Sequence, residues 1–168
     1  MTKEEFLKDV TNYNNHRYLL WQALEATSEG EVVEMGCGFG STPFLSKYCK
    51  DKNLKLASYE NDLDWYGKCL DFHNNITHLI DWGEVSEKHL TPAVLFIDHR
   101  PGERRKMDLE RFAMRARIIV IHDSEPAADH GYQMRQHFGK FKYTADWKTD
   151  GAWASVLSNF IDVSTWGN

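Results

Sequence analysis

Short apolar runs alternate with amphipathic segments along most of this chain. The apolar runs predict strands at 31–35, 54–59, 76–80, 93–97 and 118–121. Apolar positions at helical spacing predict helices between them, at 42–50, 63–73 and 103–116, with a turn or two before Pro92 and a short helix at 132–137. Because strands alternate with helices, this pattern predicts a mostly parallel sheet with helices on both faces.

The two ends of the chain depart from this alternation. The last two strand-like runs, 140–146 and 153–161, flank a turn sequence and predict a C-terminal β-hairpin. Residues 1–30 precede the first strand and predict an N-terminal helical extension, in which Asn15 is expected to cap the second helix. A length of 168 residues suits one domain, so we expect a single α/β domain over the whole chain.

Charge and composition exclude several classes of partner. The chain has 20 Lys+Arg against 25 Asp+Glu, a formal net charge of −5, which disfavours nucleic acid as a general partner. No apolar run approaches the roughly 20 residues of a membrane helix, and the first residues lack the apolar core of a signal peptide. Cys37, Cys49 and Cys69 lack the spacing of metal ligands. We therefore expect a cytoplasmic protein with reduced thiols and no membrane partner.

A glycine-rich segment, Glu34-Met-Gly-Cys-Gly-Phe-Gly40, directly follows the first predicted strand. Gly36 permits a sharp turn, Gly38 lets a ligand approach the backbone, and Gly40 allows tight packing of helix on strand. Glu60 ends the next strand, where a carboxylate can accept hydrogen bonds from ribose hydroxyls. Ligands of open α/β sheets bind outside the carboxyl ends of the strands, so these residues predict a site for a ribose-containing ligand.

This arrangement resembles the opening of class I S-adenosylmethionine (SAM) dependent methyltransferases, and the resemblance covers nearly the whole chain. It implies a Rossmann-like domain whose seven-stranded sheet ends in a hairpin, and methyl transfer from SAM to a small-molecule substrate. By this resemblance the three glycines contact the methionine part of SAM, Glu34 its amino group and Glu60 its ribose, while Asp81 and Trp82 flank the adenine. The expected cofactor site is completed by Cys37, Ser41, Asn61 and Asp98.

Acidic and imidazole side chains follow the fourth and fifth long strands. Asp98 and His99 end one strand, His122 and Asp123 the other, and these four residues are the candidate catalytic residues. The two segments resemble those of catechol O-methyltransferase-like proteins, in which carboxylates at these places hold magnesium; Ser124 stands where that family has asparagine. Three roles stay open for Asp98 and Asp123: ligands of Mg²⁺, a base for the acceptor, or structural capping.

Two other functions remain as alternatives. A nicotinamide (NAD) dependent oxidoreductase would space its glycines G-x-G-x-x-G, whereas Ser41 occupies the third glycine position here. A non-catalytic SAM-binding or partner-binding module is the other, because Pro101 stands where the catechol-type family has its catalytic lysine, and little chain is left for recognising a substrate.

A cluster of basic residues lies at 100–117. Arg100, Arg104 and Arg105 come near a predicted helix start, where a cation is unfavourable against the helix dipole. That placement suggests binding of a small or exposed anionic acceptor, and the competing explanation is a solvated helix face. The segment Asn14–Arg17 precedes the second helix and is a candidate for closing over the site.

Overall fold

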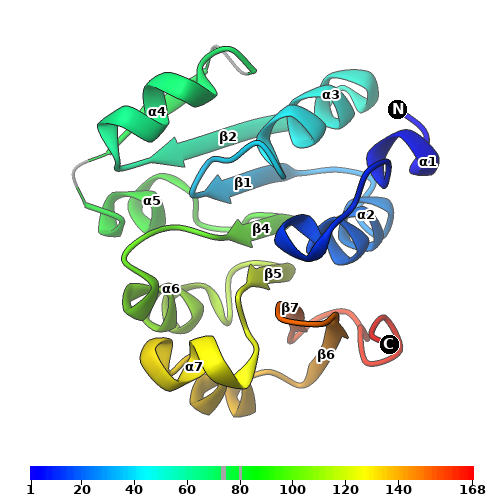
Figure 1. The fold of residues 1–168 in the computed structure, drawn as a ribbon, viewed down its shortest axis with the longest axis vertical. Coiled ribbons are helices and arrows are strands. Elements are labelled where there is room, and N and C mark those ends of the chain that lie inside the picture. The colour runs from blue at the N-terminus through cyan, green and yellow to red at the C-terminus, as the bar shows by residue number, and fades with distance from the viewer. Residues whose placement is uncertain (73–74, 80) are drawn as a thin grey trace.

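The computed structural model describes residues 1–72, 75–79 and 81–168. Within them a seven-stranded sheet has the order β3-β2-β1-β4-β5-β7-β6 (Figure 1). Strands β1 to β5 are parallel, and β7 lies antiparallel between β5 and β6. This sheet confirms the predicted α/β fold with a C-terminal hairpin. The strands are β1 Glu31–Met35, β2 Lys55–Glu60, β3 Ile76–His78, β4 Val94–Ile97, β5 Ile118–His122, β6 Tyr143–Lys148 and β7 Trp153–Ser158.

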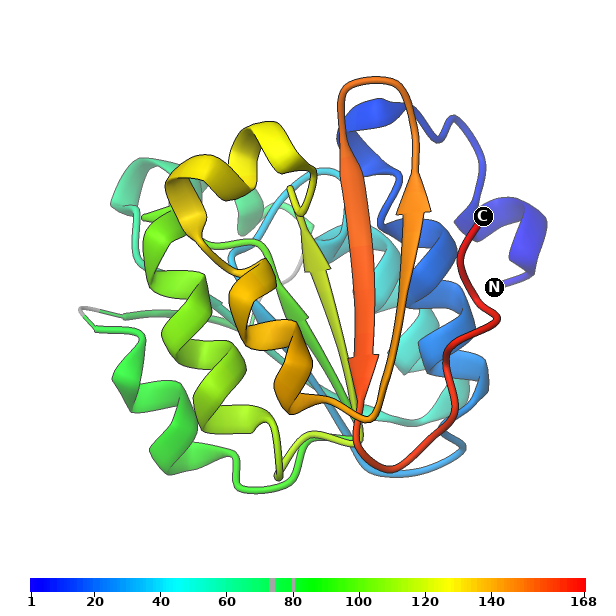
Figure 2. The same ribbon diagram turned by 90° about the horizontal axis from the view of Figure 1, so that it is seen from below.

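Helices cover both faces of the sheet (Figure 2). Residues of α1, α2 and α3 pack on one face, and residues of α5, α6 and η3 pack on the other. No helix in the described ranges has the length and apolar character needed to cross a bilayer. The α-helices are α1 Lys3–Phe6, α2 Arg17–Glu25, α3 Thr42–Lys52, α4 Leu63–Cys69, α5 Gly83–Lys88, α6 Arg105–Phe112 and α7 Pro126–Tyr132; the 3-10 helices are η1 Asn12–Asn14, η2 Gly102–Arg104 and η3 Arg135–Lys140.

Strand β4 shows why the central apolar runs are continuous rather than alternating. Val94 and Phe96 belong to the core under α1, α2 and α3, whereas Leu95 and Ile97 belong to the core under α5 and α6. All four side chains are fully buried, because successive residues of a strand point to opposite faces and both faces are covered.

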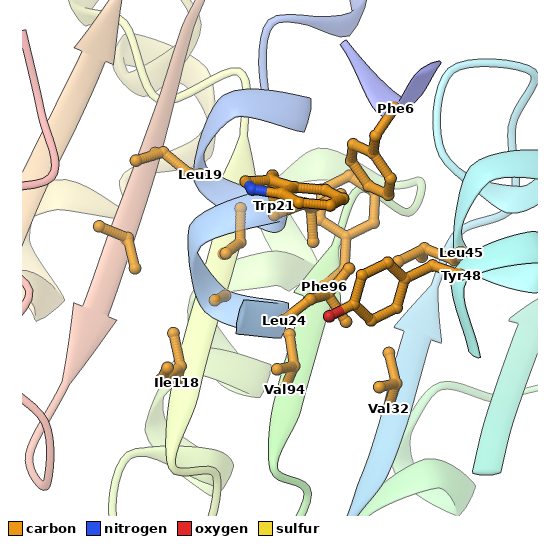
Figure 3. Close-up of a cluster of buried hydrophobic side chains, with 14 of the residues drawn as sticks. Phe6, Leu19, Trp21, Leu24, Val32, Leu45, Tyr48, Val94, Phe96 and Ile118 are labelled. Atoms are coloured by element: carbon orange, nitrogen blue, oxygen red, sulfur yellow. The ribbon is translucent and has the colours of Figure 1, made fainter. Parts of the chain in front are cut away.

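Aromatic packing fixes the N-terminal helices on the first face (Figure 3). The ring of Phe6 in α1 lies 5.4 Å from that of Trp21 in α2 and 6.2 Å from that of Tyr48 in α3, between centroids. Phe6 is fully buried, and a capping box between Thr2 and Glu5 starts its helix. Truncation of such a ring typically costs about 3–5 kcal/mol, so this short helix is held mainly by its packing.

Several predicted element boundaries need correction. Asn15 does not cap α2, because its side-chain amide donates instead to Oγ1 of Thr149 and the carbonyl of Ala152, both at 2.8 Å. The helix predicted at 42–50 is α3, which has Ser41 as its N-cap residue and ends at Lys52. His73 and Ile80, the predicted last residues of a helix and a strand, lie outside the described residues.

The helices that follow β4 and β5 also differ from the prediction. The helix expected over 103–116 begins as η2 and ends as α6 at Phe112. The helix expected at 132–137 is two elements, α7 and η3, separated where Gln133 adopts a left-handed conformation with φ of 56°. The prediction overlooked Pro126 among the first residues of α7, a position that proline favours because no backbone donor is needed there.

The segment between α1 and α2 contacts the C-terminal β6–β7 hairpin. Figure 2 shows the tip of the β6–β7 hairpin beside this segment. The contacts are hydrogen bonds from the side chain of Asn12 to the carbonyl of Asp150, and from Asn15 to the hairpin. Arg17 then donates from Nε to the carbonyl of Gly40 at 2.6 Å. The hairpin, the N-terminal segment and the glycine-rich loop are therefore linked by hydrogen bonds.

Candidate functional site

A cavity of about 640 Å³ lies at the carboxyl ends of β1, β2, β4 and β5, under the N-terminal segment. This is the volume range of small-molecule and cofactor sites, and it is the position where open α/β sheets bind ligands. Its lining comes from widely separated parts of the sequence: Tyr13, His16, Cys37, Gly38, Phe39, Gly40, Ser41, Glu60, Asp62, Asp64, Trp65, Lys68, Asp98, Arg100, Arg105, His122 and Asp123.

Each of the three glycines in the loop is suited to its position for a different local reason. Gly36 has φ of +94°, and a Cβ there would lie 2.6 Å from the carbonyl carbon of Asp98, so the loop can cross the end of β4 only with glycine. A Cβ on Gly38 would meet nothing closer than 4.0 Å, so the backbone is open to the cavity. A Cβ on Gly40 would lie 3.1 Å from Asn14, which brings the N-terminal segment against the loop.

Glu34 lies beneath the glycine-rich loop and does not line the cavity. It is fully buried and accepts hydrogen bonds from the hydroxyls of Ser41 at 2.6 Å and Thr42 at 3.1 Å. Burial raises the pKa of its carboxyl to about 7 despite these hydrogen bonds. The structure therefore places Glu34 as an anchor of the loop, outside the residues that line the cavity.

Glu60 ends β2 inside the cavity. Its carboxylate accepts backbone N–H groups from Cys37 at 3.0 Å, Asn61 at 2.8 Å and Asp62 at 2.9 Å. Burial raises the pKa of Glu60, and these hydrogen bonds oppose that effect. A carboxylate has about four acceptor positions, so Glu60 keeps room for a hydroxyl of a ligand while it stays fixed in orientation. Cys37 and Asn61 contribute through these backbone donors.

Aromatic and charged side chains form the wall next to Glu60. Phe39 of the glycine-rich loop is 49% exposed, and its ring lies 5.1 Å from that of Trp65 in α4, between centroids. The indole of Trp65 donates to the carbonyl of Cys37, which ties α4 to the loop. Lys68 lies 5.2 Å over the Trp65 ring and also lines the cavity. This wall combines flat apolar surface with one cation.

Asp98 and Asp123 are joined by a guanidinium group. Nη2 of Arg105 lies 3.0 Å from Oδ1 of Asp98, and its Nη1 lies 3.2 Å from Oδ2 of Asp123. Arg105 is 3% exposed and also donates to the carbonyls of His99 and His122 at 2.8 and 3.0 Å. Arg105 is thus occupied in organising the strand ends, and the bridge gives no support to the magnesium site expected between these two carboxylates.

His122 lies against Asp98 and opposite a second imidazole. Its Nδ1 is 3.5 Å from Oδ2 of Asp98 and 3.3 Å from Oδ1 of Asp123. Burial alone would raise the pKa of Asp98, but His122 and Arg105 hold that pKa well below its ordinary value. Burial would lower the pKa of His122, and Asp98 raises it above its ordinary value. The ring of His16 meets that of His122 edge to face, 4.6 Å between centroids.

Several residues expected in the site lie outside the cavity lining: Glu34, Gly36, Asn61, Asp81, Trp82, His99 and Arg104. His99 is buried, with Nε2 2.9 Å from Oδ2 of Asp108, and burial lowers its pKa. Trp82 is buried, stacks on His99 with centroids 4.4 Å apart, and donates to the carbonyl of Arg100. Asp81 is exposed and accepts from the backbone of Gly83. Arg104 contacts Asp81 and Asp108.

The three arginines predicted to read an acceptor have separate surroundings. Arg100 is exposed and lines the cavity. Nη2 of Arg104 lies 3.3 Å from Oδ1 of Asp81, and its Nε lies 3.7 Å from Oδ2 of Asp108. Arg105 bridges the two strand-end carboxylates. Of the three, Arg100 is therefore the one placed to meet a ligand with a side chain that has no assigned internal role.

Sequence reasoning missed much of the wall. Tyr13 is 89% exposed at the cavity, and His16 is buried beneath it, yet both precede the first strand by many residues. Phe39, Trp65 and Lys68 also line the cavity, and the sequence analysis assigned none of them to the site. A signal existed for His16, because the segment Asn14–Arg17 was a candidate for closing over the site. No pattern in the sequence marked α4 as a wall.

The fold has clear counterparts among solved structures, although the sequence does not. No protein-family model matches the chain, and no curated protein is similar to it in sequence. Similar structures include a candidate O-methyltransferase from Klebsiella pneumoniae, with a TM-score of 0.61, 15% identity, and coverage of 90% of this chain and 82% of that chain. The cofactor-bound Rv0187 from MTB has a TM-score of 0.61 at 14% identity, covering 92% and 83%.

A third similar structure is the O-methyltransferase from Bacillus cereus in complex with SAH. It has a TM-score of 0.59 and 12% identity, with 93% of this chain and 90% of that chain covered. At identities this low, the structural similarity establishes the fold alone, and the function has to be argued from the site. The Rossmann-like methyltransferase fold implied by the sequence resemblance is confirmed.

Proposed function

We propose that this protein is a SAM-dependent methyltransferase whose cofactor occupies the cavity at the strand ends. The observation that carries the proposal is that the open backbone of Gly38 and the fixed carboxylate of Glu60 face one cavity of about 640 Å³. A donor with an amino-acid part and a ribose fits that pair of features. The similar structures support the same choice, since one holds SAH, the demethylated product of SAM, and another is cofactor-bound.

In this proposal the residues of the cofactor half act by binding and orientation. Glu60 accepts a ribose hydroxyl at its remaining acceptor position. The backbone at Gly38 and Gly40 lies along the methionine part, while Phe39 and Trp65 exclude water from one side. The ionised carboxylate of Asp98 places negative charge near the positively charged end of the cofactor, which favours its binding.

The acceptor half is assigned to the residues at the ends of β4 and β5. SAM supplies an electrophilic methyl group, and the chain has to place an acceptor atom in line with it. Asp123 lines the cavity with one oxygen held by Arg105, so it is the carboxylate placed to take a proton from an acceptor hydroxyl. Arg100 adds an exposed cation at the cavity, which favours a small acceptor that carries an anionic group.

The test is transfer of a labelled methyl group from SAM into fractionated small-molecule extracts. We expect turnover with wild type and a loss of roughly 10²-fold or more in Asp123→Asn, the scale of a lost general base. Asp150→Asn changes an exposed side chain that does not line the cavity, so it is the matched control and should keep full activity. No transfer into small-molecule or protein pools, with SAH binding intact, would favour a non-catalytic SAM-binding module. NAD binding without SAM binding would favour the oxidoreductase.

A further inference from the structure

Three potential metal ligands meet at the deep end of the cavity. Asp98 follows β4, His122 ends β5, and His16 immediately precedes α2. Each offers one donor atom, and these atoms all lie within 4.8 Å of one another. His16 and His122 are 2% and 6% exposed, so the three side chains converge in a largely enclosed place.

The two imidazoles lack partners that burial would normally require. Neither ring nitrogen of His16 has a hydrogen-bonding partner among the described residues, and the same holds for Nε2 of His122. The buried His89 differs, because both of its ring nitrogens have partners, Tyr59 and Glu31. Buried polar groups are normally paired, so unpartnered nitrogens facing a cavity indicate a ligand.

The surrounding charge also suits a cation. Arg105 takes Oδ1 of Asp98, which leaves Oδ2 beside His122. Asp123 adds a second carboxylate within 3.3 Å of the same imidazole. Two carboxylates against one guanidinium leave this place negative when both imidazoles are neutral.

We propose that His16, Asp98 and His122 bind one divalent transition-metal ion, such as Zn²⁺ or Co²⁺. Two imidazole nitrogens and one carboxylate oxygen suit this class of metal, whereas magnesium prefers an all-oxygen set. All three residues line the cavity, so the remaining coordination positions face the space assigned to the acceptor. This site uses a different ligand set from the magnesium pair considered from the sequence.

The three metal ligands are inferred from their geometry and do not depend on the proposed function. Only the role of the metal in methyl transfer rests on the proposed function. A metal ion here would hold the acceptor oxygen and lower the pKa of its hydroxyl. The proton would then pass to Asp123, and the oxygen would form its new bond to the methyl carbon as the carbon–sulfur bond breaks. The released electron pair stays on sulfur, giving the neutral thioether.

The experiment is a titration of chelator-treated, full-length protein with Co²⁺, followed by visible absorption, and then with Zn²⁺ as competitor. We expect one equivalent of Co²⁺ with the absorption of an imidazole-bound ion, displaced by one equivalent of Zn²⁺. Affinity should fall by at least about 100-fold in His16→Ala and in His122→Ala, since removal of a group that only orients a metal ligand already costs about 10–100-fold. His130→Ala removes an exposed histidine and should bind as wild type does.

Two further measurements keep the outcomes distinct. His16→Gln and His122→Gln serve where the alanine variants fail to fold, as judged by circular dichroism. Folded wild type that binds neither ion stoichiometrically, or binding that survives both replacements of His16, would overturn the metal site. SAH affinity is measured separately by calorimetry, so metal binding without SAH binding would contradict the proposed function and leave this site standing.

Discussion

Nη2 of Arg105 lies 3.0 Å from Oδ1 of Asp98. The sequence had suggested separate roles for these residues, with Arg105 binding an acceptor and Asp98 binding a metal ion or taking a proton. The same guanidinium reaches Asp123 and two backbone carbonyls. Arg105 therefore determines the arrangement of both strand ends that carry the candidate chemistry.

Arg105→Ala should lower the free energy of unfolding by about 3 kcal/mol, because it leaves two carboxylates and two carbonyls without their donor. Urea denaturation measures this loss. The control is Arg115→Ala, which removes an exposed arginine of the same basic cluster and should stay within about 0.5 kcal/mol of wild type. Equal stability of the two variants would contradict this organising role of Arg105.

The buried carboxyl of Glu34 should make stability depend on pH. Its folded-state pKa is about 7 and its ordinary value is 4.5, so its stabilising contribution is complete below pH 4.5 and is lost as pH rises through 7. Relative to Glu34→Gln, wild type should lose about 3 kcal/mol of unfolding free energy over that interval. Urea denaturation at several pH values checks this. Glu103→Gln, at an exposed position, should track wild type; a Glu34→Gln curve parallel to wild type would exclude a buried proton on Glu34.

Separate replacement of Arg100 and Arg104 should show which of the two arginines binds the acceptor. Arg100→Ala removes an exposed cation at the cavity, so we expect a KM for an anionic acceptor raised by about tenfold, with unchanged SAH affinity. Arg104→Ala changes contacts with Asp81 and Asp108 outside the cavity and should leave the KM unchanged. Steady-state kinetics on a neutral and an anionic acceptor would show whether the effect follows the charge.

The fold was predictable because its signals are local. Continuous apolar runs marked the buried strands, and the turn sequence before Trp153 marked the hairpin. Boundaries failed where a tertiary contact competed with a local rule, as when the Asn15 amide bonded to the hairpin instead of capping α2.

The candidate site was predictable only in part. Glu60, Gly38, Asp98 and Asp123 line the cavity because strand ends and the loop after β1 meet there in any such sheet. His16 could not be placed from the sequence, since its position depends on how the N-terminal segment packs on Gly40. The side chains of Glu34 and His99 instead pair with the buried side chains of Ser41 and Asp108. No sequence pattern showed these contacts.

The most direct test of the account is calorimetric titration of SAH into wild type, Glu60→Ala and Glu60→Gln. Glu60 is expected to hold the ribose, and hydrogen bonds to a charged group contribute about 1.5–3 kcal/mol, so Glu60→Ala should bind SAH about 10–100-fold more weakly. Glu60→Gln should lose less, and Glu103→Ala should match wild type. Failure of folded wild type to bind SAM or SAH at millimolar concentration would contradict the central claim.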